Sequence, residues 1–321
     1  MAGWRSALRT EWSGLLAVLA AGAAALAVTR PAFLSEYNLY VVLTSFSLWS
    51  IVAMAQMVTL AVGQMNLAVG ALGGLVAVAV GGLIEVWGAP LPAAVLAGLL
   101  IGLAGGAING ALVVGTGING FIITLATLSA YRGIDYGITH SQPFYAMPAA
   151  LKAFGVERWG AVPALLVVPL VVVPAMALIM RRTLLGRHML AVGGNPQAAA
   201  LSGIPARRTI VAAHVISGGL AAIAAMMTVA RLQQAQPTIG SDWLILSFAA
   251  PIIGGAALQG GHVSVLGTCL GVLLVTLIND ALVLVEIDPF WVQVVLGALI
   301  LGAVGLNRLR EGRRPGEAVA R

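Results

Sequence analysis

The stretch Gly186–Arg208, GRHMLAVGGNPQAAALSGIPARR, is a polar segment flanked by arginines in an otherwise apolar chain. Its residues predict a short helix with two defined ends. Asn195 is a favourable N-cap because its side chain can accept hydrogen bonds from the first helical N–H groups, and Pro196 fits the first helical position, where no N–H is needed. Gln197–Ser202 would form the turns, and Gly203 can adopt the left-handed conformation that often ends a helix.

A helix of this length is roughly 10 Å long and has little core of its own. The segment is therefore either a capped linker or a docking element for another protein. We favour the docking element.

The composition indicates a polytopic membrane protein. Of the 321 residues 60% are hydrophobic and 9% are charged, and the mean hydropathy is +1.00, whereas soluble domains carry about 25% charged residues. The net charge of +6 is accordingly interpreted through loop topology, and no nucleic-acid partner is expected. A single cysteine, Cys269, excludes an internal disulfide, and the four histidines are scattered without ligand spacing, so no metal site is expected.

Ten apolar runs are long enough, or nearly so, to cross a bilayer, which predicts an all-α protein with residues 1–321 in a single transmembrane domain. The run Phe121–Tyr131 is too short to cross alone, so it is either extended by its polar flanks or partly re-entrant. The first run resembles a signal peptide, but we favour a retained span. The runs are Trp12–Thr29, Tyr40–Val62, Leu67–Ile84, Leu91–Gly115, Phe121–Tyr131, Val162–Met180, Thr209–Ala230, Trp243–Leu258, Val263–Val285 and Phe290–Leu306.

The distribution of basic residues predicts the orientation. With the N-terminus inside, the cytoplasmic pieces carry twelve of the seventeen Lys and Arg residues, as the positive-inside rule requires. Both termini are then cytoplasmic, residues 181–208 form a cytoplasmic loop with the short helix, and residues 307–321 form a basic cytoplasmic tail. The long loop 132–161 falls on the outer side.

Two similar sequence segments predict an internal repeat. Ile108–Val114, INGALVV, reappears as Ile278–Leu284, INDALVL, in the fourth and ninth runs. The two copies lie five spans apart, an odd number, so they would cross the bilayer in opposite directions. Spans 2–5 and 7–10 would then form an inverted repeat with the substrate path between the halves.

The chain contains no signature of ATP hydrolysis. Its only lysine, Lys152, does not follow the glycine-rich turn that a phosphate-binding loop needs. We therefore expect a transport protein without an ATPase site, not an enzyme.

Polar side chains inside predicted spans are candidates for the translocation path, because polar groups at such depth are costly unless they are satisfied. Each has a structural alternative: Asn66 could cap its span, Asn109 could bond a neighbouring helix, and Asp280 could reach the outer headgroups beside Asn279. The aromatic residues that open the fifth and tenth runs complete the candidates, namely Phe121, Phe290 and Trp291.

The segment Gly186–Arg208, with its Gly-Gly-Asn and its alanine-rich Ser-Gly-Ile sequence, resembles the cytoplasmic loop of permease subunits of ribose-type ABC sugar importers, in the branched-chain amino acid and sugar permease superfamily. Three other stretches agree in order along nearly the whole chain: Gly63–Gly70, Phe121–Gly133, and Gly254–Gly267 followed by Pro289-Phe290-Trp291. One departure is Gln64 with Asn66, where the family commonly has Ile-Asp-Leu-Ser.

The resemblance implies a multi-pass permease of the bacterial inner membrane that forms a homodimer or heterodimer. It implies two kinds of partner: a cytoplasmic ABC ATPase, which binds the ATP and Mg²⁺, and a periplasmic or lipid-anchored substrate-binding protein. This chain would bind no cofactor of its own and would contact lipid. The residues that correspond to the coupling helix of the family, together with Pro196 at its first helical position, are Gly193, Gly194, Asn195, Ala199, Ser202 and Gly203.

The resemblance implies a small neutral sugar or polyol as the substrate, and the scarcity of charge in the spans favours such a substrate over an amino-acid zwitterion. Import of branched-chain amino acids, nucleosides or autoinducer by a related permease is the alternative within the superfamily. An ion-coupled carrier or channel that needs no ATPase is the alternative of another class.

Overall fold

The computed structural model describes residues 3–287, 291, 294, 297–298 and 301–302, and within them the chain is almost entirely helical. A short antiparallel hairpin pairs β1 (Arg158–Trp159) with β2 (Val162–Pro163), and two 3-10 turns are present, η1 (Pro31–Leu34) and η2 (Ala164–Leu166). The helices are α1 (Gly3–Thr29), α2 (Glu36–Ala61), α3 (Val69–Glu85), α4 (Leu91–Thr116), α5 (Gly120–Thr139), α6 (Ala149–Val156), α7 (Val167–Arg182), α8 (Leu184–Gly194), α9 (Pro196–Leu201), α10 (Ala206–Leu232), α11 (Trp243–Ile253) and α12 (Val265–Leu284).

Local capping sets the start of several helices. The side-chain oxygens of Ser35, Asn119, Thr183 and Ser264 accept hydrogen bonds from backbone N–H groups at the starts of α2, α5, α8 and α12. Such caps satisfy donors that have no partner within the helix.

Within the described residues, five helical segments are long and apolar enough to cross a membrane: α2, α4, η2 with α7, α10 and α12. Three shorter apolar helices accompany them: Gly14–Thr29 within α1, then α3 and α11. The chain is thus an all-α, multi-pass membrane protein. The count of ten spans stays a prediction, and most of the expected run Phe290–Leu306 lies outside the described residues.

Three expected runs have other boundaries in the structure. Phe121–Tyr131 belongs to the continuous 20-residue helix α5, so its polar flanks extend it and the start of the expected outer loop 132–161 is helical. The run that was expected from Val162 begins with β2 and η2, and α7 starts only at Val167. The run expected to end at Leu258 ends at Ile253, because Gly255 takes a φ of +91° that a helix cannot continue.

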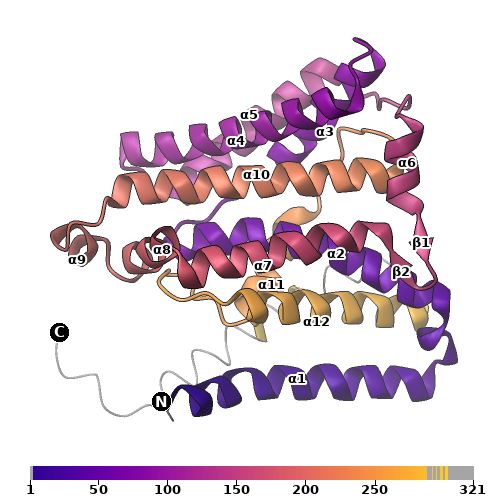
Figure 1. The fold of residues 1–321 in the computed structure, drawn as a ribbon, viewed down its shortest axis with the longest axis horizontal. Helices are drawn as coiled ribbons and strands as arrows, with labels where there is room; N and C mark the ends of the chain where they lie inside the picture. Colours follow the sequence, from indigo (N-terminus) through magenta and orange to yellow (C-terminus); the bar gives the residue numbers. More distant parts are fainter. Residues whose placement is uncertain (1–2, 288–290, 292–293, 295–296, 299–300, 303–321) are drawn as a thin grey trace.

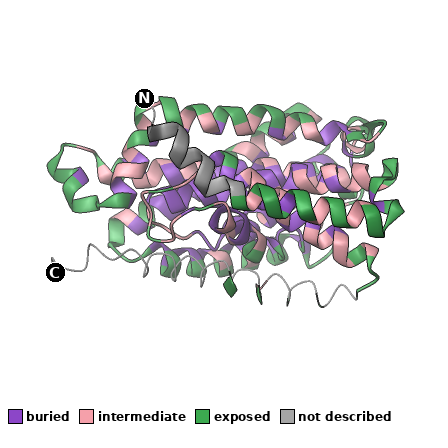
Figure 2. Ribbon diagram, turned by 90° about the horizontal axis from the view of Figure 1, so that it is seen from below, coloured by how far each residue is buried: buried purple, intermediate pink, exposed green. Residues whose placement is uncertain are grey.

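The helices α2 and α10 form the centre of the bundle (Figure 1). α4 packs on α10, α12 packs on α2, α3 packs on α4, α5 and α10, and α1 covers α12. Ile51, Met54 and Met57 of α2 are fully buried, and buried residues concentrate in this central layer (Figure 2). A helix that is apolar all round belongs in such an interior position.

The helices α4 and α12 run in opposite directions. Arg207, at the start of α10 next to α9, donates a 3.2 Å hydrogen bond to the carbonyl of Val114 near the end of α4. Asp280, near the end of α12, accepts a 3.0 Å hydrogen bond from Asn38 at the start of α2. The helix α2 starts at the end of the bundle opposite α9 (Figure 1). The similar segments Ile108–Val114 in α4 and Ile278–Leu284 in α12 therefore lie at opposite ends of the bundle.

Two irregular connections enter the bundle from opposite ends. Residues 62–68 join α2 to α3, and residues 233–242 join α10 to α11. The second connection contacts the start of α3, just after the first connection, where a Cβ on Gly240 would lie 2.7 Å from the Gly70 carbonyl carbon. Only glycine fits there, because its φ of +83° and the close backbone contact both exclude a side chain.

Candidate functional site

The predicted short helix is present as α9. Asn195 is its N-cap, and its side-chain oxygen accepts hydrogen bonds from the N–H groups of Gln197 at 3.0 Å and Ala198 at 2.9 Å. Pro196 occupies the first helical position. The start of the helix is therefore fixed by its own residues, as the sequence indicated.

The end of α9 is also defined locally. Gly203 takes a φ of +77°, and its N–H donates to the carbonyl of Ala200 at 3.0 Å while the N–H of Ile204 donates to Ala199 at 3.0 Å. This pair of bonds is a Schellman motif, which satisfies the last helical carbonyls. Ser202 is exposed, and its hydroxyl donates to the carbonyl of Ala198.

The two faces of α9 differ. Ala199 is buried against the bundle, whereas the side chain of Leu201 is 91% exposed. Residues two positions apart on a helix, such as Ala199 and Leu201, point to nearly opposite sides. The helix α9 lies at the tip of the molecule (Figure 1). A large apolar side chain is thus presented at an extremity, a feature that sequence reasoning missed.

The helix α8, directly before α9, was also missed, because residues 181–208 were interpreted as a loop with one short helix. Its side chains Met189 and Val192 are fully buried, and Thr183 caps its first turn. The cap and the apolar pair three residues apart are the signals that could have revealed it. α9 is consequently attached to a packed helix.

Glycines join the end of α8 to two other segments. The N–H of Gly261, in the connection between α11 and α12, donates to the carbonyl of Ala61 at the end of α2 at 3.2 Å. A Cβ on Gly193 would lie 2.5 Å from that Gly261 nitrogen, and a Cβ on Gly260 would lie 2.6 Å from the Cα of Gly63. We call Gly63, Gly193, Gly260 and Gly261 the glycine junction; within it three segments touch through their backbones. Gly194, beside it, is exposed.

Asn66 lies in the first irregular connection and is almost fully buried. Its amide nitrogen donates to the hydroxyl of Ser217 on α10 at 3.0 Å, and its side-chain oxygen accepts from the N–H of Ala68 at 3.0 Å. The Gln56 amide, in the orientation that satisfies both of its groups, bonds the Asn66 backbone at 2.8 and 3.2 Å. Asn66 therefore satisfies buried backbone where the helix is interrupted.

The start of α5 is tied to the same connection. Gln64 accepts a 2.9 Å hydrogen bond from the N–H of Gly120, and the Thr124 hydroxyl accepts from the N–H of Leu67 at 3.0 Å. Phe121, a predicted path residue at this point, is exposed.

The other predicted path residues have separate surroundings. Asn109 is fully buried, and its side-chain oxygen accepts from the hydroxyl of Tyr131 on α5 at 3.0 Å. Asp280 bonds Asn38 at the far end of the bundle, and the neighbouring Asn279 has a buried side-chain oxygen. Their contact with substrate stays a prediction. Phe290 lies outside the described residues, and Trp291 is exposed.

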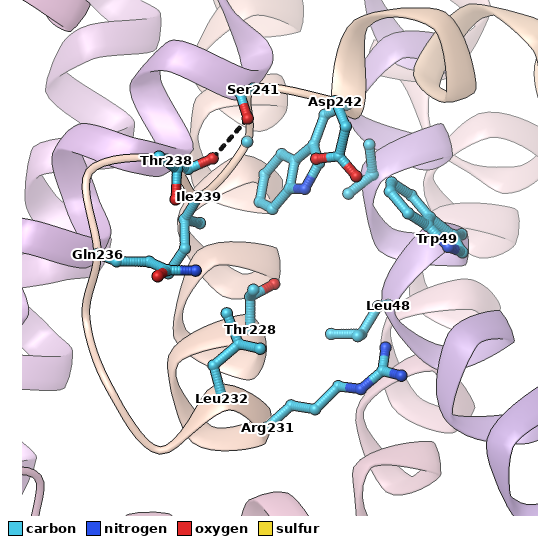
Figure 3. Close-up of a pocket in the computed structure, with 13 residues that line it drawn as sticks. Leu48, Trp49, Thr228, Arg231, Leu232, Gln236, Thr238, Ile239, Ser241 and Asp242 are labelled. Carbon is cyan, nitrogen blue, oxygen red and sulfur yellow. Dashed lines mark hydrogen bonds between the residues drawn. The ribbon is translucent and has the colours of Figure 1, made fainter. Parts of the chain in front are cut away.

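A pocket of about 340 Å³ lies between α2, the end of α10 and the connection to α11. None of the predicted path residues that the structure describes lines it. Figure 3 shows Gln236 and Thr228 on one side and Trp49 on the other, with Asp242 at the top and the Arg231 side chain reaching from below toward Leu48 and Trp49. The lining consists of Leu48, Trp49, Val52, Thr228, Arg231, Leu232, Gln236, Thr238, Ile239, Gly240, Ser241, Asp242 and Trp243.

Sequence reasoning missed this pocket, although a signal was present. The stretch from Arg231 to Asp242 interrupts two apolar runs with charged and amide side chains and is followed directly by Trp243. Polar residues combined with an aromatic residue at a break between spans are typical of sites in discontinuous helices.

Known proteins similar to this chain are transport permeases. D-allose transport system permease protein AlsC of Escherichia coli (strain K12) is 32% identical over 277 residues, which cover 86% of this chain and 85% of that protein. Ribose import permease protein RbsC of Bacillus subtilis (strain 168) is 31% identical over 283 residues, with 88% of each chain covered. Autoinducer 2 import system permease protein LsrC of Enterobacter sp. (strain 638) is 33% identical over 308 residues, covering 94% of this chain and 88% of that one.

No solved structure is significantly similar to the chain. Residues 38–304 match the family described as the permease component of branched-chain amino acid transport systems. The span of that match and its agreement with the relatives show that this chain is a member of that permease family.

Proposed function

We propose that this chain is the membrane-spanning permease subunit of a binding-protein-dependent ABC importer, and that it translocates a small neutral sugar or polyol across the inner membrane. The carrying observation is α9, a helix with both ends capped that presents Leu201 at the tip of the bundle. The sugars named in similar permeases, D-allose and ribose, support the substrate class. The autoinducer permease among the relatives supports an autoinducer as the second candidate substrate.

The energy for transport comes from ATP hydrolysis by a separate ATPase subunit, which holds the ATP and Mg²⁺. The permease itself has no ATPase site. Closure of the ATPase dimer moves α9, whose proposed docking and positioning residues are Gly193, Gly194, Asn195, Pro196, Ala199, Ser202 and Gly203. The ligand-free and ATP-bound assemblies then favour different arrangements of the helices.

The movement is transmitted through the glycine junction. α9 follows α8 directly, and the end of α8 contacts the ends of two other segments through backbone atoms. Segments that contact each other directly through their backbones can move little relative to one another, since packed interiors deform poorly. A displacement of α9 accordingly shifts the end of α2 and the connection before α12 together.

An inverted repeat within ten spans fits this arrangement. The pairs α4 with α10 and α12 with α2 pack in corresponding ways, and α4 and α12 run in opposite directions. Irregular connections follow α2 and α10, and the second of them contacts the start of α3 at Gly240 and Gly70. Interrupted helices in corresponding positions of two halves are typical of transporters.

We place α9 and both termini in the cytoplasm, in line with the charge distribution. The described start of α1 is at the α9 end of the bundle (Figure 1). The opposite end then faces a periplasmic or lipid-anchored binding protein, and a second permease subunit completes the importer.

Transport in proteoliposomes tests the proposal. The permease is reconstituted alone, with its ATPase, or with the ATPase and binding protein, and uptake of labelled D-allose, D-ribose, L-arabinose and L-leucine is measured. We expect ATP-dependent sugar uptake only with all components. Uptake by the permease alone would establish an ion-coupled carrier or channel, and uptake of leucine without any sugar would replace the substrate class.

A further inference from the structure

The pocket at the end of α10 has the size and composition of a small-ligand site. Its volume of about 340 Å³ lies at the lower end of the roughly 300–1,000 Å³ range of small-molecule pockets. Neutral hydrogen-bonding side chains line it, namely Thr228, Gln236, Thr238 and Ser241. Hydroxyl and amide groups both donate and accept, so they match the hydroxyls of a sugar.

Two indoles form part of the wall. Trp243 is almost fully buried, and its ring lies so close to α3 that a Cβ on Gly73 would come within 3.0 Å of its Cη2 atom. Trp49, on α2, is half-buried and borders the pocket (Figure 3). Trp243 is therefore fixed by packing, whereas Trp49 offers a ring surface to a ligand.

The charged groups of the lining balance each other. Arg231 extends from the last turn of α10 and Asp242 lies just before α11, and both border the pocket. One positive and one negative group give the described lining no net charge, which suits a neutral ligand. Both can also bond hydroxyls, since a guanidinium donates and a carboxylate accepts.

The pocket wall is coupled to the core of the bundle. The connection that carries Gln236 and Asp242 is held by a 2.7 Å bond from the Ser241 hydroxyl to the carbonyl of Thr238. The same connection contacts the start of α3 at Gly240 and Gly70. A shift of α3 or α2 thus changes the shape of the pocket, as release of a transported ligand requires.

We propose that this pocket is the site where the permease contacts the transported sugar. Trp49 stacks on the apolar face of the sugar ring, and Gln236, Arg231 and Asp242 bond its hydroxyls. The assignment rests on the proposed function.

Uptake by the complete importer tests the role of the side chains. We expect Trp49→Ala to lower the rate of sugar uptake by about two- to tenfold, the range expected for loss of one aromatic contact. Gln236→Ala should lower it similarly, and Trp49→Phe should retain most of the activity. Trp87→Ala, which removes an exposed indole beyond the end of α3, is the matched control and should leave uptake unchanged. ATPase association should be normal in all four variants, which shows that they fold.

Thiol protection tests occupancy without relying on transport. Cys269 is the only cysteine of the chain, so Cys269→Ser gives a background into which Ser241→Cys places one thiol at the pocket. We expect millimolar D-allose, D-ribose or L-arabinose, whichever the wild-type importer transports, to slow its reaction with a methanethiosulfonate reagent.

The outcomes separate the two proposals. Failure of the wild-type importer to transport any of these sugars overturns the proposed function. Normal sugar uptake by the wild type together with unchanged uptake in Trp49→Ala and Gln236→Ala, or with no protection of the introduced thiol, overturns the pocket assignment alone. Protection by L-leucine and by none of the sugars overturns the ligand class.

Discussion

Gly261 donates its backbone N–H to the carbonyl oxygen of Ala61 at 3.2 Å, and this bond ties the connection before α12 to the end of α2. Gly193 lies against the same pair of groups. Because α9 follows α8 directly, its position is linked to both segments through backbone contacts. The neighbouring Gly194 has room for a side chain, since within 4 Å a Cβ there would meet only the Cα of Gly261, at 3.9 Å.

Gly193→Ala and Gly194→Ala are a matched pair for testing this link. We expect Gly193→Ala to disrupt the glycine junction at a cost of about 1–3 kcal/mol, typical of overpacking, and to reduce ATP-driven uptake. Gly194→Ala should be close to wild type. Thermal unfolding in detergent and uptake in proteoliposomes check both, and equal behaviour of the two variants would refute a role for the junction.

Leu201 should be an anchor for the ATPase subunit, because its side chain is 91% exposed on α9. Burying a leucine side chain contributes roughly 1.5–3 kcal/mol, so we expect Leu201→Ala to weaken ATPase association about 10- to 100-fold. Leu184→Ala removes the same side chain from an exposed position on α8 and is the control. Dissociation constants from a binding titration measure the difference; identical values for the two variants would exclude Leu201 as an anchor.

Asn195→Ala should remove the N-cap of α9 and with it the bonds to Gln197 and Ala198. The expected cost is about 1 kcal/mol of local helix stability, seen as faster amide hydrogen exchange in residues 197–201. Asn195→Asp keeps an acceptor oxygen and should preserve the exchange protection and ATPase association. Unchanged exchange in the alanine variant would show that the cap contributes nothing.

The features that could be predicted from the sequence are those that act within a few residues. Asn195, Pro196 and Gly203 define α9 through their own backbones, so the helix and its ends follow from local chemistry. The glycine junction and the pocket unite residues from distant segments, such as Trp49 with Arg231, and a single sequence carries no information on those contacts. Asn66 was a candidate for the path because it is polar, but its partner Ser217 is visible only in the fold.

Gly203 tests backbone strain separately from packing. A Cβ there would meet nothing within 4 Å, so any effect of substitution comes from its φ of +77°. A β-branched residue resists this conformation, whereas asparagine tolerates it. We therefore expect Gly203→Val to impair ATPase association in pull-down experiments and Gly203→Asn to preserve it. Normal pull-down of the valine variant would mean that the end of α9 does not affect docking.

Asp280 can be assigned to structure or to the translocation path by a double-mutant cycle with Asn38. Their 3.0 Å hydrogen bond joins α12 to α2, and bonds to a carboxylate contribute about 1.5–3 kcal/mol when the carboxylate is ionised. We expect Asn38→Ala and Asp280→Ala to lower thermal stability non-additively. If Asp280 has only a structural role, uptake per folded importer should be unchanged in both single variants, and total uptake should fall only because less folded importer is present. If uptake per folded importer falls in Asp280→Ala but not in Asn38→Ala, the carboxylate contributes to the path beyond its bond to Asn38.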